Sequence, residues 1–125
     1  MFKLKIYYED TDAGGVVYHA NYLKFLERAR TQLLLEGGFT HNILREKFNI
    51  ITVVKSCEID FIKPVILDSE LEISTFLIKK SKIQFFLEQK IYCNNVIVVK
   101  AKVRIVTINI KGKISRMPWD LFNIF

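Results

Sequence analysis

The sequence predicts an α+β protein in which one long helix precedes a run of antiparallel strands. Two observations carry this prediction. Residues 21–36 have the apolar spacing of a helix, and much of the chain after residue 50 alternates between apolar and polar residues with the period of a strand. Strands that follow one another without intervening helices favour an antiparallel sheet over a parallel one. A single helix lying across a long curved sheet would bury the apolar stripe of the helix.

The first half of the chain contains the predicted long helix. A first strand is expected over residues 2–8, and a turn-rich stretch follows it over residues 9–15. The helix is expected over residues 21–36, with Asn21 as its capping residue and Gly37-Gly38 as its end. Its apolar residues recur at spacings of four, three and four, which places them on one stripe: Tyr22, Leu26, Ala29 and Leu33.

The second half is predicted to be mostly strand. A short second helix is expected over residues 41–48 and a short closing helix over residues 118–122, opened by Pro118. Several strands are apolar on both faces, and one helix cannot cover both. We therefore expect a leftover apolar face or a sheet edge to pack on another subunit. The strands are expected over residues 50–61, 70–79, 83–93 and 96–109.

Length and composition restrict the functions that need to be considered. The 125 residues are enough for one domain, which we expect to span residues 1–125. Half of the residues are hydrophobic and 26% are charged, which excludes intrinsic disorder. The net charge of +6 favours an anionic partner, and nucleic acid, a membrane surface and a phosphorylated small molecule all fit it.

Several classes of site and location are not expected. No stretch approaches the roughly 18 apolar residues of a membrane span, and the start of the sequence lacks the apolar core of a secretory signal. Cys57 and Cys93 form no close pair, which favours free thiols in a reducing cytoplasm. His19 and His41 have no Cys or carboxylate at ligand spacing around them, so we expect no metal site.

Asp12 is the residue that the local pattern singles out. It lies in a turn that contains Gly14 and Gly15, and the predicted helix begins a few residues later. The start of a helix offers unpaired backbone N–H groups and about half a positive charge. A carboxylate beside such donors makes a minimal acyl-transfer site, with one group to attack or to activate water and another to hold the oxyanion. An Asp in such a turn can equally be a turn former or a cap.

A long motif resembles a known family. Residues 7–22 read YYEDTDAGGVVYHANY, and Phe25 and Glu27-Arg28-Ala29-Arg30 follow. This string closely resembles the 4-hydroxybenzoyl-CoA thioesterase-like family, and more narrowly its bacterial acyl-CoA thioesterases linked to the Tol-Pal envelope system. Weaker resemblance continues through residues 61–73, 86–91 and 116–118. It implies the hot-dog fold, a long central helix wrapped by a curved antiparallel sheet.

The resemblance also implies an activity. Members hydrolyse acyl-CoA to a free carboxylic acid and CoA without a cofactor, as dimers paired into tetramers with active sites at subunit interfaces. By position, Asp12 matches the catalytic carboxylate, which acts as nucleophile or general base. His19 matches the residue whose backbone N–H polarises the thioester carbonyl, and Tyr8 matches a tyrosine beside the site. The basic residues expected to contact CoA phosphates are Lys79, Lys80, Lys82 and Arg116.

Other interpretations stay open at this point. His19 and Tyr8 could serve only in packing, and each lysine could be ordinary surface. The carrier could be an acyl-carrier protein rather than CoA. A hydratase of enoyl thioesters would use a differently placed Asp and His pair. The main alternative is a non-catalytic or carrier-protein-binding hot-dog partner of the envelope and phospholipid synthesis machinery. A nucleic-acid binder is not expected, because Phe85 and Phe86 are surrounded by core residues rather than exposed among basic ones.

Overall fold

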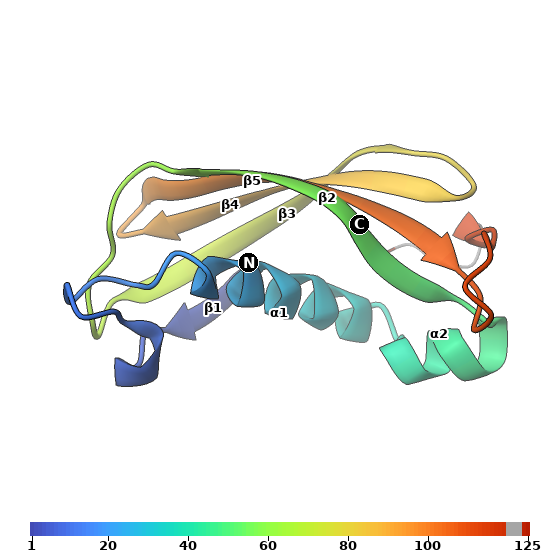
Figure 1. Ribbon diagram of the computed structural model, residues 1–125, viewed down its shortest axis with the longest axis horizontal. Helices are drawn as coiled ribbons and strands as arrows, with labels where there is room; N and C mark the ends of the chain where they lie inside the picture. Colours follow the sequence, from blue (N-terminus) through green and yellow to red (C-terminus); the bar gives the residue numbers. More distant parts are fainter. Residues whose placement is uncertain (120–123) are drawn as a thin grey trace.

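A curved sheet with one long helix along it forms the body of the molecule (Figure 1). The computed structural model describes residues 1–119 and 124–125. The elements in chain order are β1 (Phe2–Lys5), the 3-10 turn η1 (Tyr8–Asp10), α1 (Asn21–Glu36), α2 (His41–Phe48), β2 (Ile51–Phe61), β3 (Glu70–Lys80), β4 (Gln84–Cys93) and β5 (Val96–Ile108).

The five strands pair in the order β1-β3-β4-β5-β2, and every neighbouring pair is antiparallel. The α+β prediction is therefore confirmed. Strand β2 lies at one edge of the sheet and β1 at the other, so each has one side without a strand partner among the described residues. Figure 1 shows α1 running beneath the sheet, with α2 beyond the far end of α1.

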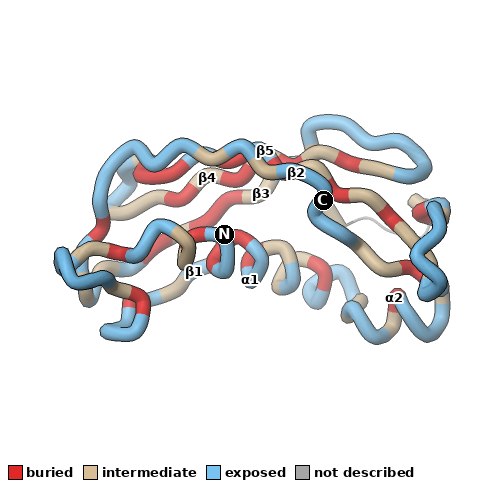
Figure 2. Tube along the Cα trace, viewed as in Figure 1, coloured by how far each residue is buried: buried red, intermediate tan, exposed pale blue. Residues whose placement is uncertain are grey.

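The core lies between α1 and the sheet. Figure 2 shows buried residues alternating along the strands and on the inner side of α1. The predicted helical stripe is correct in its first three residues and then shifts by one, because Leu34 is buried whereas Leu33 is only half-buried. A stripe with a 3.6-residue period drifts around the helix in this way. Phe25 also belongs to this buried face.

Most element boundaries agree with the predictions to within one residue, and two assignments differ. The predicted first strand, residues 2–8, ends at Lys5 because η1 closes with a bond from Asp10 N–H to Tyr7 O of 2.9 Å. Asn21 is not the cap of α1, since Ala20 occupies that position and Asn21 is the first helical residue. The predicted closing helix falls largely on residues 120–123, which lie outside the described part of the chain.

The face of the sheet turned away from α1 is charged across its middle rather than apolar. Lys102 of β5 lies between Glu58 of β2 and Glu88 of β4 on neighbouring strands. These positions alternate with buried ones such as Leu87 and Gln89, which point toward α1. The exposed aliphatic side chains instead include Val53 and Val54 on the β2 edge and several isoleucines in turns. None of the described helices is long and apolar enough to cross a membrane.

Candidate active site

The loop between η1 and α1 is held at both ends by Asp10. Its side chain is buried, and its two oxygens accept hydrogen bonds from Tyr7 N–H (2.9 Å) and from Asn21 Nδ2 (3.0 Å). Its backbone oxygen accepts from Tyr18 N–H at 2.9 Å. Asp10 thereby ties the start of the loop to the start of α1. Sequence reasoning missed this role, because the bond to Asn21 joins residues that are eleven positions apart.

Asp12 lies at the tip of this loop with its side chain exposed. One carboxyl oxygen, Oδ1, accepts a hydrogen bond from Gly14 N–H at 2.8 Å. A Cβ atom on Gly14 would come within 3.1 Å of that oxygen, and Gly15 has a φ of +80°, which L side chains rarely adopt. The two glycines therefore permit the close turn around the carboxyl group. Within the described residues, the second oxygen, Oδ2, has no hydrogen-bond partner.

His19 precedes α1 and presents both a ring and a backbone donor. Its ring contacts the rings of Tyr18 and Phe61, with centroids 4.7 Å and 6.0 Å away. The next turn closes through Tyr22 N–H to His19 O at 3.3 Å. In the part of the chain that the structure describes, the backbone N–H groups of His19 and Ala20 have no acceptor. Two donors at the positive end of a helix are thus available to an oxygen that gains charge.

Asp12 and His19 line the same open cleft, of about 260 Å³. Phe61 and Lys63 reach this cleft from the end of β2 and the loop after it, so the sheet supplies its opposite wall. Burial raises the pKa of the Tyr22 hydroxyl to about 12, with a smaller effect of Cys93. The complete lining is Asp12, Val16, Val17, His19, Tyr22, Phe61, Ile62, Lys63 and Pro64.

The other predicted site residues lie elsewhere. Tyr8 is 83% exposed and does not line the cleft. Lys79 and Lys80 are at the opposite end of β3 from the Asp12 loop, about 30 Å away at roughly 3.3 Å per strand residue. The Lys79 ammonium lies 4.5 Å from the ring centroid of Phe86. Lys82 and Arg116 lie at the same end of the molecule, so one chain does not bring the basic residues to the cleft.

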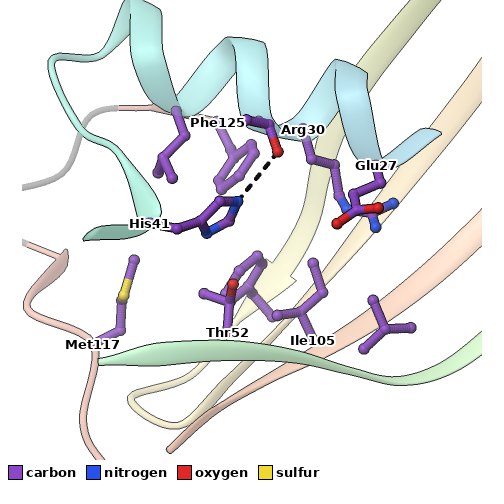
Figure 3. Close-up of a pocket in the computed structure, with 11 residues that line it drawn as sticks. Glu27, Arg30, His41, Thr52, Ile105, Met117 and Phe125 are labelled. Carbon is purple, nitrogen blue, oxygen red and sulfur yellow. Dashed lines mark hydrogen bonds between the residues drawn. The ribbon is translucent and has the colours of Figure 1, made fainter. Parts of the chain in front are cut away.

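A second cavity lies beneath the later turns of α1 (Figure 3). Arg30 borders it and donates a 2.9 Å hydrogen bond to the buried Gln89 Oε1. Burial lowers the pKa of the Arg30 guanidinium, an effect that the nearby Glu27 opposes. His41 Nε2 lies 3.2 Å from Thr31 Oγ1, the contact dashed in Figure 3. This cavity contains neither Asp12 nor His19, so it is separate from the cleft.

The cleft has the groups that acyl transfer requires. Asp12 offers a carboxyl oxygen for attack or for deprotonating water, and the start of α1 offers N–H donors for the oxygen of a carbonyl group. The surrounding aromatic side chains suit an apolar group next to the reacting carbon. Across residues 1–119 and 124–125, no three His, Cys, Asp or Glu side chains lie close enough together to hold a metal ion.

Comparisons with known proteins identify the family to which the chain belongs. The chain matches the thioesterase-like superfamily over residues 7–125. It is 40% identical to the acyl-CoA thioesterase YbgC of Haemophilus influenzae over 91% of this chain and 83% of that protein. It is 36% identical to the acyl-CoA thioester hydrolase YbgC of Escherichia coli O157:H7 over 92% of this chain and 87% of that protein.

A solved structure gives the same result for the fold. A probable thioesterase from Bartonella henselae superimposes with a TM-score of 0.90 and 39% sequence identity. The match covers 94% of this chain and 97% of the other. Together with the sheet order and the position of α1, this similarity confirms the hot-dog fold expected from the sequence.

Proposed function

Since this chain belongs to the thioesterase-like superfamily, we propose that it is an acyl-CoA thioesterase, which hydrolyses acyl-CoA to a free carboxylic acid and CoA. One observation carries the proposal beyond family membership. Asp12, with one oxygen held by Gly14 N–H and the other without a partner among the described residues, shares a cleft with the open end of α1. Asp12 and His19, whose backbone N–H has no acceptor among the described residues, therefore line the same cleft, and this N–H can act as an oxyanion donor.

The reaction proceeds in this cleft through groups of this chain. Asp12 Oδ2 either attacks the thioester carbonyl carbon or takes a proton from a water molecule that attacks it. The negative charge that develops on the carbonyl oxygen is stabilised by the backbone N–H group of His19 at the start of α1. The carbon–sulfur bond then breaks and the thiolate leaves. In the nucleophilic route, water subsequently hydrolyses the acyl-Asp12 anhydride, so both routes consume one water molecule.

A thiolate is a good leaving group, and this suits a site without a strong general acid. We assign the His19 ring to the wall of the acyl site, where it contacts Phe61. Tyr8 takes part only if a second copy of the chain covers it, because its side chain projects into solvent in a single chain.

The separation of Asp12 from the basic residues leads us to propose that a second copy completes each site. Among the described residues, the edge strand β2 has one side without a strand partner, and exposed Val53 and Val54 lie on this strand. Two antiparallel copies meeting at this edge would bring the basic end of one chain toward the Asp12 cleft of the other. In this arrangement the CoA phosphates contact residues of the second copy: Lys79, Lys80, Lys82 and Arg116. Two such dimers would form the tetramer.

Three finer assignments belong to the same proposal. The long motif over residues 7–22 supports membership of the 4-hydroxybenzoyl-CoA thioesterase-like family and of its branch linked to the Tol-Pal system. The two free cysteines, Cys57 and Cys93, support a cytoplasmic location. The acyl carrier is CoA, and an acyl-carrier protein is the alternative. Absence of copurification with Tol-Pal components in cells would remove the assignment to the Tol-Pal branch without affecting the proposed activity.

The activity is tested with purified protein and a panel of aliphatic and aromatic acyl-CoAs in a free-thiol colour assay. We expect release of CoA thiol at a rate proportional to protein concentration for at least one acyl group. Enoyl-CoA absorbance, followed in parallel, distinguishes a hydratase, which would consume the double bond without releasing thiol. Absence of thiol release across the whole panel would overturn the proposed activity and favour the non-catalytic alternative.

A further inference from the structure

Two short segments share an unusual composition and exposure. Residues 78–83 read Ile-Lys-Lys-Ser-Lys-Ile, and residues 110–116 read Ile-Lys-Gly-Lys-Ile-Ser-Arg. Both segments are basic and neither contains an acidic residue. All four isoleucines are exposed to solvent, Ile110 by 59% and Ile114 by 71%. Single exposed aliphatic residues are common, but four of them interleaved with six basic residues form a distinct surface.

Hydrogen bonds place the two segments side by side. Met117 N–H donates to Lys82 O at 2.7 Å, and Thr107 N–H donates to Ile83 O at 3.1 Å. Thr107 O in turn accepts from Ser115 N–H at 3.1 Å, so Thr107 joins both segments. Figure 1 shows the two turns at the same end of the molecule, and Figure 2 shows both as exposed. We call residues 78–83 and 110–116 together the Ile-Lys surface.

Residues 110–114 form the outer turn of this surface, and hydrogen bonds define its shape. Asn109 Oδ1 accepts hydrogen bonds from Lys111 N–H at 2.9 Å and from Lys113 N–H at 3.1 Å. Asn49 Oδ1 accepts from Ile110 N–H at 3.1 Å and fixes the turn against the end of α2. Gly112 has a φ of +79°, which allows the chain to reverse between the two lysines. Ile110 and Ile114 are therefore presented by a preformed turn.

We propose that the Ile-Lys surface docks on an anionic phospholipid bilayer. Ile110 and Ile114 would enter the headgroup region, and Lys111 and Lys113 would contact lipid phosphates. Interfacial binding combines buried apolar side chains with basic residues near a negative surface. Nucleic acid would use the charges but gain little from exposed aliphatic side chains, because bases stack on aromatic rings. The bilayer is the partner that uses both features of the surface.

The outer turn allows lipid binding to be tested separately from the proposed thioesterase activity. Lys79, Lys80, Lys82 and Arg116 contribute charge to the surface and also have the CoA role proposed above. The outer turn has no part in that role. Substitutions at Ile110, Lys111, Lys113 and Ile114 therefore test lipid binding without touching the residues assigned to the cleft or to CoA.

The test is cosedimentation of the purified protein with vesicles. One set of vesicles contains phosphatidylcholine alone, and the other contains phosphatidylcholine mixed with phosphatidylglycerol. We expect binding to the mixed vesicles that weakens as salt is added, and much weaker binding to phosphatidylcholine. A basic residue near an anionic surface contributes about fivefold to partitioning, so Lys111→Glu with Lys113→Glu should lower it by about 25-fold or more.

The isoleucines are tested separately from the charges. Ile110→Ser with Ile114→Ser should lower partitioning about tenfold, since both side chains would lose contact with the bilayer. Lys24→Glu with Lys100→Glu changes the net charge equally at two exposed lysines outside the surface and should retain most of the binding. Far-ultraviolet circular dichroism and the thioesterase rate, which should both remain unchanged in the outer-turn variants, show that each variant is folded.

Three outcomes would overturn the proposal. The first is equal partitioning into both kinds of vesicle or no partitioning into either. The second is an equal loss in the Lys24 and Lys100 control, which would indicate attraction by net charge alone. The third is unchanged lipid binding by the serine variant together with wild-type binding to duplex DNA that is tighter than its binding to the mixed vesicles. This result would indicate a nucleic-acid surface.

Discussion

Replacing Asp10 by alanine should destabilise the protein strongly even though the residue is absent from the cleft. The Asp10 side chain is 6% exposed and accepts two hydrogen bonds, from Tyr7 N–H and from Asn21 Nδ2. Alanine removes both acceptors and leaves these donors without partners. A hydrogen bond to a charged group contributes about 1.5–3 kcal/mol. We therefore expect the free energy of unfolding to fall by about 2–4 kcal/mol. For 125 residues, the unfolding entropy of about 0.26 kcal/mol/K converts this to a fall in Tm of about 8–15 °C.

The assay is thermal unfolding at one fixed protein concentration, followed by circular dichroism. Glu9→Ala is the matched control, because Glu9 lies in the same 3-10 turn with an exposed side chain. It should change the free energy of unfolding by less than about 0.5 kcal/mol. Asp10→Ala should also reduce thiol release at temperatures where it remains folded, because Asn21, two residues after His19 at the start of α1, loses its bond to the loop. A stability equal to that of Glu9→Ala would refute the claim that Asp10 holds the loop.

Three further predictions follow from the buried groups and the basic end. Gln89→Leu should lower the free energy of unfolding by about 2–4 kcal/mol, because Arg30 loses its acceptor, and adding Arg30→Met should recover part of this loss in chemical denaturation. The Tyr22 pKa is raised from 10.0 to about 12, so its contribution to stability is present below pH 10.0 and is lost as the pH rises to about 12. In thermal unfolding across that range, Tyr22→Phe should lose stability less steeply than wild type, and equal slopes would contradict the assignment. Lys79→Ala with Lys80→Ala should raise KM more than it lowers kcat, most clearly at low salt, and an unchanged KM there would exclude the phosphate role.

The sequence was sufficient to predict the regular elements, because their periodicity is local. Residues 21–36 and 41–48 are helices as predicted, and the four later strands begin and end within one residue of their predicted bounds. The predictions are wrong where a contact with another part of the chain determines the local structure. Asn21 has the side chain of a cap but donates to Asp10 instead. The first strand is shorter than its alternation suggests because the chain turns into η1 at Tyr8.

The candidate site was predictable where its residues are close in sequence. Asp12 and His19 are seven positions apart, and a glycine turn followed by a helix start indicates that they face one cleft. Phe61 and Lys63 complete that cleft from about 40 residues later, and only the pairing of β2 with β5 places them there. The distance of the basic residues from Asp12 follows from the length of β3 and its register. Such long-range geometry has no local signal in a single sequence.

The central claim is that the Asp12 carboxyl group carries out the chemistry while the start of α1 holds the oxyanion. The most direct measurement compares free-thiol release by wild type, Asp12→Asn and His19→Ala on the acyl-CoA that wild type hydrolyses fastest. Asn keeps an oxygen for Gly14 N–H but cannot act as a base, so Asp12→Asn should remain folded and lose nearly all turnover. His19→Ala keeps its backbone donor and should retain substantially more activity than Asp12→Asn. Thiol release by folded Asp12→Asn at the wild-type rate would contradict the account.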